Sequence, residues 1–286
     1  MRPFRLAASL ACAALVVACS AAQFAYNRLD FIARWELGKY VDMDKAQRAR
    51  FDADFRTFWD WHRRSELPRY AAALRRIAAR VDTPPDDAEL ERWADEYGAL
   101  WTPALEHLMP VLCPLGASLG AAQVKSLLEQ ADDDLRDYAE EAVDAPEDAL
   151  RDKAERSLRK SLGHWLGELR PAQKQMVHDW NATRPWVAGP WLAFRQRWRD
   201  ALAATLAQRG AADFCARLTP LVTAGDRLWT AEQRRAFAAN RERWLQLFAQ
   251  LAPTLDAAQR EHLRQRLLEL AEQLEALSRS PGAAAT

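Results

Sequence analysis

The spacing of apolar residues constrains this chain more than any other feature of its sequence. Phe51, Phe55 and Phe58 are separated by four and then three positions, and the leucines from Leu263 to Leu277 keep the same spacing. Apolar residues at this spacing lie on one face of an α-helix. No stretch alternates apolar and polar residues over the length of a strand between hairpin turns. The pattern therefore predicts an all-α fold, an elongated bundle of about nine or ten helices by ordinary helix and loop lengths.

Short proline-containing segments mark where helices are expected to end. Pro68 removes a backbone donor and disfavours helical geometry at Leu67, so we expect a kink or break there. Further breaks, with Asp or Thr as caps for the next helix, are expected at residues 82–87, 144–148, 183–191 and 251–256. No long linker divides the chain. We expect one helical domain over residues 25–278 and a disordered tail over residues 279–286.

The N-terminus has the layout of a secretory signal peptide. Arg2 and Arg5 precede an apolar run over residues 6–18, which is too short to cross a membrane as a permanent helix. The sequence LVVAC, which closes this region, resembles the bacterial lipobox. The resemblance implies that residues 1–18 are removed and that Cys19 is acylated. A plain secretory signal with a cysteine there by chance is the alternative.

Acylation would tie the protein to a membrane. Two or three chains such as palmitate anchor a protein stably, whereas a single chain does not. Residues 19–24 would then form a tether. Lipoprotein sorting generally retains proteins with aspartate after the acylated cysteine in the inner membrane, so Ser20 indicates the outer membrane. We expect a lipid-anchored envelope protein on the periplasmic face of the outer membrane.

The charge balance and the cysteines bear on partners and compartment. The 40 basic and 40 acidic residues cancel, and a basic excess is what drives binding to phosphate backbones. We therefore expect no nucleic-acid partner, and the oligomeric state stays open. Cys113 and Cys215 are the other cysteines of the expected mature chain. In an oxidising envelope they can form a disulfide. Two buried free thiols are equally compatible with the sequence.

A short pattern recurs at five places: a large apolar residue, a cap position, two further residues and a glutamine. In a capping box the cap side chain accepts from the backbone of the fourth residue, whose own side chain reaches back to the cap. The copies are therefore expected to begin helices, and losing such a cap costs about 1 kcal/mol. The cap and glutamine positions are Asp44 and Gln47, Gly120 and Gln123, Arg170 and Gln173, Thr230 and Gln233, and Asp256 and Gln259.

The capping box leaves the choice of glutamine unexplained. Glutamate would suit the positive end of a helix better, yet every copy has glutamine. The form Leu-Thr-x-x-Gln resembles a motif repeated in the periplasmic Spy-type chaperones, which are small helical proteins that hold unfolding clients without ATP. This resemblance implies a role in binding unfolded proteins.

Longer segments resemble an uncharacterised family of bacterial lipoproteins, catalogued as domain of unknown function 6279. The segments are the lipobox, AYNRLDFIARWELGKYVDMDKAQ at residues 25–47 and WHRRSELPRY at residues 61–70, followed by the glutamine-containing helix starts. The resemblance covers most of the mature chain. It implies an envelope lipoprotein and supplies no activity.

The segment at residues 61–70 is also the densest group of aromatic and charged residues. Trp, Tyr and Arg are enriched in binding hot spots, so one interpretation is a binding face. The other is a kinked helix whose aromatic side chains pack inside, because an aromatic stripe at helical spacing is usually core. The candidate binding face consists of Trp61, His62, Arg63, Arg64, Glu66, Arg69 and Tyr70.

Catalytic and metal-binding patterns are few. The run GASLG at residues 116–120 matches the nucleophile-elbow pattern around Ser118, but that pattern needs a preceding strand. The five histidines form no pair three or four positions apart, and the acidic run at residues 131–137 lacks the glycine and final glutamate of a calcium loop. We expect no metal, no cofactor and no enzymatic activity.

Two functions fit these expectations. The first is a non-enzymatic envelope lipoprotein, a helical module that binds peptide or protein clients in an amphipathic groove, as a chaperone would. The second is a structural or assembly factor of the outer membrane with one fixed protein partner. An enzyme is third, supported only by Ser118.

Overall fold

The computed structural model describes residue 26 and residues 29–280. The predicted signal peptide, Cys19, the tether and residues 281–286 of the predicted tail lie outside the described residues. Within these residues every regular element is helical, so the predicted all-α, multi-helix fold is confirmed. Among the described helices, none is by itself long and apolar enough to cross a membrane. The segments Asp87–Ser118 and Ala121–Ala142 meet that criterion only together, and they are bent by 119°.

The chain order of the elements falls into two halves. The first half contains α2 (Leu29–Gly38), α3 (Lys45–Trp61), the π-helix η1 (His62–Glu66), α4 (Leu67–Ala78), α5 (Asp87–Gly98), the 3₁₀-helix η2 (Ala99–Trp101), α6 (Thr102–Ser118) and α7 (Ala121–Ala142). The second half contains α8 (Glu147–Leu166), α9 (Pro171–Thr183), α10 (Ala188–Ala207), α11 (Phe214–Thr223), η3 (Gly225–Leu228), α12 (Ala231–Leu251), η4 (Ala252–Thr254) and α13 (Ala257–Arg279).

Local sequence signals set several helix boundaries. Asp44, Thr230 and Asp256 each accept a hydrogen bond from the backbone N–H three residues on, and each forms a complete capping box. Gly120 and Arg170 offer no side-chain acceptor there, so only the glutamine half of the box is present in their helices. All five copies of the pattern begin helices. The break expected near Leu67 takes the form of η1, whose wider turn lies between α3 and α4.

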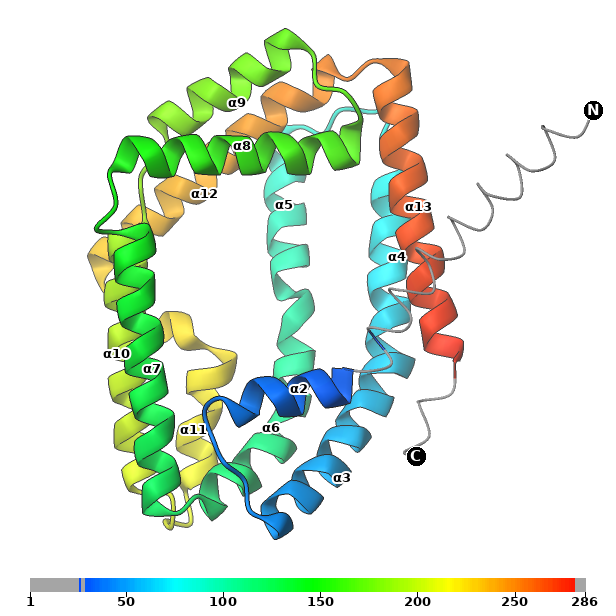
Figure 1. Ribbon diagram of the computed structural model, residues 1–286. Coiled ribbons are helices and arrows are strands. Elements are labelled where there is room, and N and C mark those ends of the chain that lie inside the picture. The colour runs from blue at the N-terminus through cyan, green and yellow to red at the C-terminus, as the bar shows by residue number, and fades with distance from the viewer. Residues whose placement is uncertain (1–25, 27–28, 281–286) are drawn as a thin grey trace, which may run out of the picture.

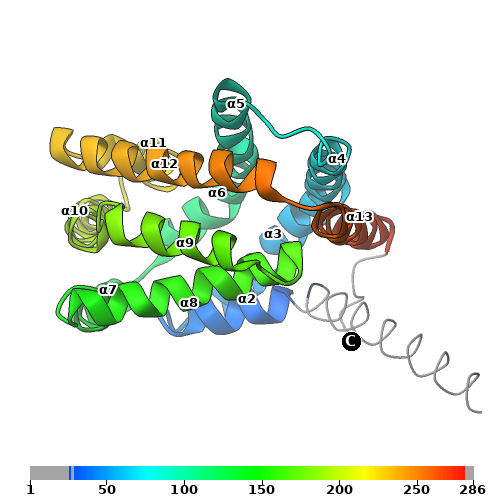
Figure 2. The same ribbon diagram turned by 90° about the horizontal axis from the view of Figure 1, so that it is seen from above.

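The helices form a frame (Figure 1). One upright side consists of α7 and α10, and the opposite side consists of α4 and α13. One end is made by α8, α9 and α12, and the other by α2, α3 and α6. Figure 2 shows α13 and α4 together at one edge and α10 and α7 at the other. The elongated bundle expected from the sequence thus takes the shape of a frame. Each end has its own apolar core, one around Phe51 and Val111 and one around Val177 and Leu247.

The two halves of the frame repeat one arrangement. In the first half α3 packs on α6, as α9 packs on α12 in the second. The halves also exchange contacts, because α6 packs on α11 and α12 packs on α5, while α7 packs on α10 and α13 packs on α4. If each helix from α3 to α7 is replaced by the helix six places later in the numbering, and the reverse, each of these pairs becomes another pair of the same set. The frame has an approximate twofold relation between α2–α7 and α8–α13.

Sequence and hydrogen bonds support this repetition. Leu100-Trp101-Thr102, before and at the start of α6, recurs as Leu228-Trp229-Thr230 before α12. The Arg69 side chain of α4 donates to the Leu100 carbonyl at 2.7 Å, and Arg197 of α10 donates to the Leu228 carbonyl at 3.2 Å. These matches align α4 with α10 and the segment from α5 to α6 with the segment from α11 to α12.

The recurring glutamines meet in pairs where two helix N-termini approach each other. Gln47 Nε2 donates to Gln123 Oε1 at 3.1 Å, and Gln123 Nε2 donates back to Gln47 Oε1 at 2.6 Å. Gln173 and Gln259 form the same reciprocal pair, at 2.9 Å in both directions. A carboxylate has no N–H to donate. The pairing therefore explains why these four copies have glutamine in place of glutamate.

Each paired glutamine also donates to the chain that precedes its partner's helix. The acceptors are the carbonyls of Asp42 and Ser118 in one junction, and the Glu168 carbonyl and Thr254 hydroxyl in the other. The two junctions thus use equivalent positions, and they align α7 with α13. The fifth copy, Gln233, donates to the Pro190 carbonyl at 2.6 Å and accepts from Arg197.

Candidate functional site

The two upright sides of the frame differ in how tightly their helices pack. We call α4 with α13 the closed side and α7 with α10 the open side. On the closed side Ala71 of α4 and Ala271 of α13 are fully buried. Their equivalents on the open side are Arg199 and Leu135, and both are only half-buried. No residue of α7 is buried, although the helix spans 22 residues. Two large side chains thus stand where the closed side has two methyl groups.

A cleft of about 450 Å³ lies on the open side. Its walls come from α7, α10 and α11. The turn at Gly225 and Tyr40, in the turn that follows α2, complete the lining. This volume is within the range of ligand-binding pockets in proteins. The side chains along the cleft include Leu135 of α7, Phe194, Arg195 and Trp198 of α10, and Leu221 and Val222 of α11.

Some charged groups of the cleft have a hydrogen-bond or ion-pair partner among the described residues, and one does not. The Tyr40 hydroxyl donates to the Asp134 carboxylate, and this bond, with a smaller effect of burial, raises the pKa of Tyr40 to about 12. Arg199 pairs with Asp132 at 2.5 Å. Arg195 lies over the ring of Tyr138 at 5.0 Å, and within the described chain no carboxylate lies within ion-pair distance of it. Arg195 is therefore a cation available to a ligand.

Two contacts fix the aromatic wall of the cleft. The Trp198 indole N–H donates to the Leu221 carbonyl at 2.7 Å, which ties α10 to α11. Gly225 lies against both aromatic side chains of this wall, because a Cβ there would be 3.6 Å from Phe194 and 3.8 Å from Trp198. The wall combines flat apolar rings with a nearby guanidinium, so the cleft is suited to bind an apolar group that carries a negative charge.

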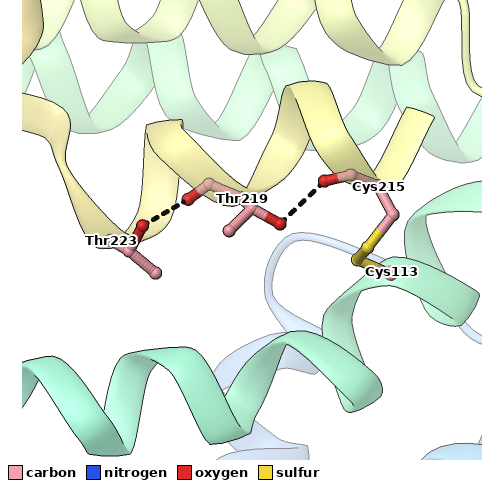
Figure 3. The surroundings of a disulfide bond; sticks show 4 residues. All are labelled: Cys113, Cys215, Thr219 and Thr223. Carbon is pink, nitrogen blue, oxygen red and sulfur yellow. Dashed lines mark hydrogen bonds between the residues drawn. A yellow bond between two sulfur atoms is a disulfide. The ribbon is translucent and has the colours of Figure 1, made fainter. Parts of the chain in front are cut away.

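A disulfide fixes α11, which forms one wall of the cleft, to the end of the frame. Cys113 of α6 and Cys215 of α11 are bonded, with their Cα atoms 5.3 Å apart (Figure 3). Of the two alternatives that the sequence left open, the structure contains the bonded one. The equivalent contact of α12 with α5 is an exposed ion pair, in which Arg241 reaches Asp95 at 2.6 Å.

The candidate binding face predicted at residues 61–70 is largely interior. His62, Arg63 and Glu66 are buried, with relative exposures of 8%, 2% and 3%. Arg63 donates to the Leu277 carbonyl at the end of α13, at 3.1 Å. Arg69 pairs with Glu66 at 3.0 Å. Of the two interpretations left open by the sequence, the binding face is wrong for these three buried residues, because the π-helical turn directs His62 and Arg63 toward Tyr26 and α13.

The rest of that segment packs by ring stacking. Trp61 stacks on His107 with ring centroids 3.5 Å apart, and Trp59 stacks on His62 at 4.9 Å. His62 Nδ1 lies 3.0 Å from the Tyr26 hydroxyl. Burial, with the nearby charge of Arg63, lowers the pKa of His62 to about 4. The remaining residues, Arg64 and Tyr70, are exposed and half-buried respectively.

Ser118 belongs to a glutamine junction. It is the last residue of α6. Its hydroxyl donates to the Leu115 carbonyl at 2.8 Å and accepts from Gln47 Nε2 at 3.3 Å. The described chain has no strand before it, so the support that a nucleophile elbow requires is missing there. Among the described residues no group of three or more His, Cys, Asp or Glu side chains is placed to hold a metal ion.

Residues 39–234 match a family described as a family of unknown function, DUF6279. The chain belongs to this family. The matched range contains every residue that lines the cleft and ends in the first turn of α12, so α13 of the closed side lies beyond it. No curated protein and no solved structure matches the chain.

The residues that line the cleft in this family member were not among the predicted site residues. In the sequence Phe194 and Trp198 have the spacing of one helix face, a pattern that a packed core and the wall of a cleft share. The recurrence of Leu-Trp-Thr at Leu100 and Leu228 is the signal that could have revealed them. This recurrence aligns the two halves, and the alignment shows that Arg199 stands where the first half has Ala71.

Proposed function

We propose that this protein is a lipid-anchored envelope protein that binds segments of other polypeptides, without catalysing a reaction, in the cleft on the open side of its frame. One observation carries the proposal. The helix pair α4 and α13 packs tightly on the closed side, whereas its equivalent, α10 and α7, borders a lined cleft on the open side. The closed side thus serves as an internal reference, because it represents the same architecture with buried alanines in place of the larger side chains of the open side.

The composition of the cleft supports this function. Aromatic rings with an adjacent guanidinium are common at sites of protein recognition. The signal-peptide layout and the lipobox-like sequence before Cys19 support the envelope location. The Cys113–Cys215 disulfide agrees with an oxidising compartment.

Site-specific photocrosslinking in living cells tests the proposal. A photoreactive amino acid is placed at Leu135 or Val222 in the cleft and, as a control, at the exposed Arg156 on α8. We expect the cleft positions, and not Arg156, to give adducts with many envelope polypeptides. One stoichiometric adduct from both cleft positions would favour an assembly factor with a fixed partner. If the cleft positions give no more adducts than Arg156, the proposal is wrong.

A further inference from the structure

The alignment of the two halves indicates what kind of group the cleft accepts. Aligned on the shared Leu-Trp-Thr sequence, Leu221 and Gly225 of the open side stand where α5 has Trp93 and Tyr97. Tyr97 interacts with Arg76 of α4, so a large aromatic side chain helps join α5 to α4 there. The open side has a leucine and a glycine at these positions. At these two positions the open side therefore lacks two aromatic rings that the closed side contains, whereas Phe194 stands where the closed side has Glu66.

The charge of the cleft departs from the closed side in the same place. Arg195 stands where the closed side has Leu67, which is 2% exposed. A buried apolar residue thus becomes a half-buried cation in the open half. The other charged groups near it are already engaged, because Arg199 pairs with Asp132 and Asp134 accepts from Tyr40. A ligand carboxylate would meet Arg195 without displacing an existing ion pair.

From these two differences we infer that the cleft selects a client segment in which an aromatic side chain lies next to an acidic one. The ring enters the space bounded by Phe194, Trp198, Leu221 and Gly225, and the carboxylate pairs with Arg195. Because the cleft opens to solvent, the side chains can enter from a longer polypeptide that continues outside. This inference rests on the proposed function and specifies its clients.

Three synthetic peptides test the selectivity. The peptides are acetyl-SGSFDSGS-amide, a form with asparagine in place of aspartate, and a form with alanine in place of phenylalanine. Their capped ends leave the aspartate as the only charge. Binding of the unlabelled peptides to the full-length protein in detergent micelles is measured by isothermal titration calorimetry. We expect the first peptide to bind at least about tenfold more tightly than either of the others. The asparagine form loses a charge-assisted hydrogen bond, and the alanine form loses the burial of an aromatic ring.

Variants taken from the closed side locate the site. Arg195→Leu introduces the residue found at the equivalent position, and it should abolish the preference for aspartate over asparagine while keeping the preference for phenylalanine over alanine. Gly225→Tyr introduces the side chain found at the equivalent Tyr97. By filling the cleft, it should weaken the binding of the first peptide at least about tenfold. Gly98→Tyr is the matched control, because Gly98 is exposed and has nothing within 4 Å of an added Cβ. It should bind as the unmodified protein does.

The outcomes separate this inference from the proposed function. If Arg195→Leu keeps the full preference for aspartate, or if the three peptides bind equally, the inferred selectivity is wrong. Adducts at Leu135 and Val222 in cells would then still support a binding cleft of another specificity. Should Gly225→Tyr lose its helical circular dichroism, Leu221→Trp replaces it as the filling variant. Unchanged binding by a folded filling variant would overturn the assignment of the ring to this space.

Discussion

Gln173 and Gln259, 86 residues apart in the sequence, hold each other by two hydrogen bonds of 2.9 Å, and both side chains are buried. Each amide oxygen also accepts from the backbone N–H that begins its own helix. Each amide nitrogen donates to the chain before the other helix. One side-chain type thus caps a helix and joins two helices, which requires a donor and an acceptor on the same group.

Replacing one of these glutamines by glutamate should destabilise the protein. In Gln259→Glu the ionised carboxylate would face the Gln173 oxygen and the Glu168 carbonyl without a proton to donate. We expect a loss of about 3 kcal/mol in the free energy of unfolding at pH 7, as for a buried unsatisfied charged group. Urea unfolding followed by circular dichroism measures it. Gln196→Glu, on an exposed position of α10, is the matched control and should change stability by less than about 0.5 kcal/mol.

The same variant should become relatively more stable in acid. Burial against acceptors favours the protonated carboxyl, so the folded pKa of the new glutamate lies above its unfolded value of about 4.3. A group with a raised folded pKa contributes stability below the unfolded pKa, and this contribution is lost as pH rises through the folded pKa. The difference between Gln259→Glu and the unmodified protein should therefore shrink as pH falls below neutrality. A difference that is constant with pH would contradict the pairing.

Gly116→Ala tests the contact between α6 and α11 beside the disulfide. An added Cβ would lie 2.9 Å from Cζ of Phe214, and overpacking of this kind costs about 1–3 kcal/mol. Gly163→Ala, also in a helix but with nothing within 4 Å, should instead stabilise the protein by up to about 1 kcal/mol. Thermal unfolding of both variants checks this pair of opposite signs. Adding Phe214→Leu to Gly116→Ala should recover part of the loss.

Reduction of the Cys113–Cys215 disulfide should lower stability. The bond joins residues separated by 102 positions, and closing so long a loop restricts the unfolded chain strongly. We expect a loss of about 2–4 kcal/mol on reduction, measured by urea unfolding with and without dithiothreitol. The double variant Cys113→Ser with Cys215→Ser should be equally destabilised and should not respond to the reductant. A response in the double variant would show that the effect arises elsewhere.

His62 should make the fold sensitive to mild acid. Its pKa is lowered to about 4 in the folded protein by burial and by the charge of Arg63, whereas an unfolded histidine titrates near pH 6.5. Between these values the unfolded chain binds a proton that the folded chain excludes, so stability is lost as pH falls from about 6.5 to about 4. We expect a loss on the order of 2 kcal/mol over this window. It should be absent in His62→Gln, when both are compared by urea unfolding at several pH values.

The open and closed sides should differ in local stability. α7 has no buried residue, whereas its equivalent α13 buries Leu267, Ala271 and Leu277. Helices with few buried contacts open at lower free energy. In hydrogen exchange followed by mass spectrometry, the middle of α7 should exchange at least about tenfold faster than the middle of α13. Equal protection of the two helices would mean that the open side is as tightly held as the closed one.

The candidate site lay mostly beyond the reach of sequence reasoning. The stripe of Phe194 and Trp198 is correctly apolar, but an amphipathic stripe is compatible with a packed core and with the wall of a cleft. Whether this stripe is core or cleft wall depends on the residues of α7 that lie opposite it. The equivalence of Leu135 to the buried Ala271 shows that a larger side chain stands at this contact on the open side. The segment at residues 61–70 showed the opposite case. Its composition was compatible with a binding surface and with interior packing, and the π-helical turn places Arg63 in the interior.

The sequence by itself determined the helices and many of their boundaries, because apolar periodicity and caps such as Asp44 and Thr230 act between residues a few positions apart. It also determined family membership. Only the tertiary structure decided why glutamine recurs, because the partner of Gln173 is far away in the chain. It also decided that one side of the frame is open. That difference arises where two helices from different halves meet, and whether a methyl group or a large side chain stands at the contact sets how closely they pack.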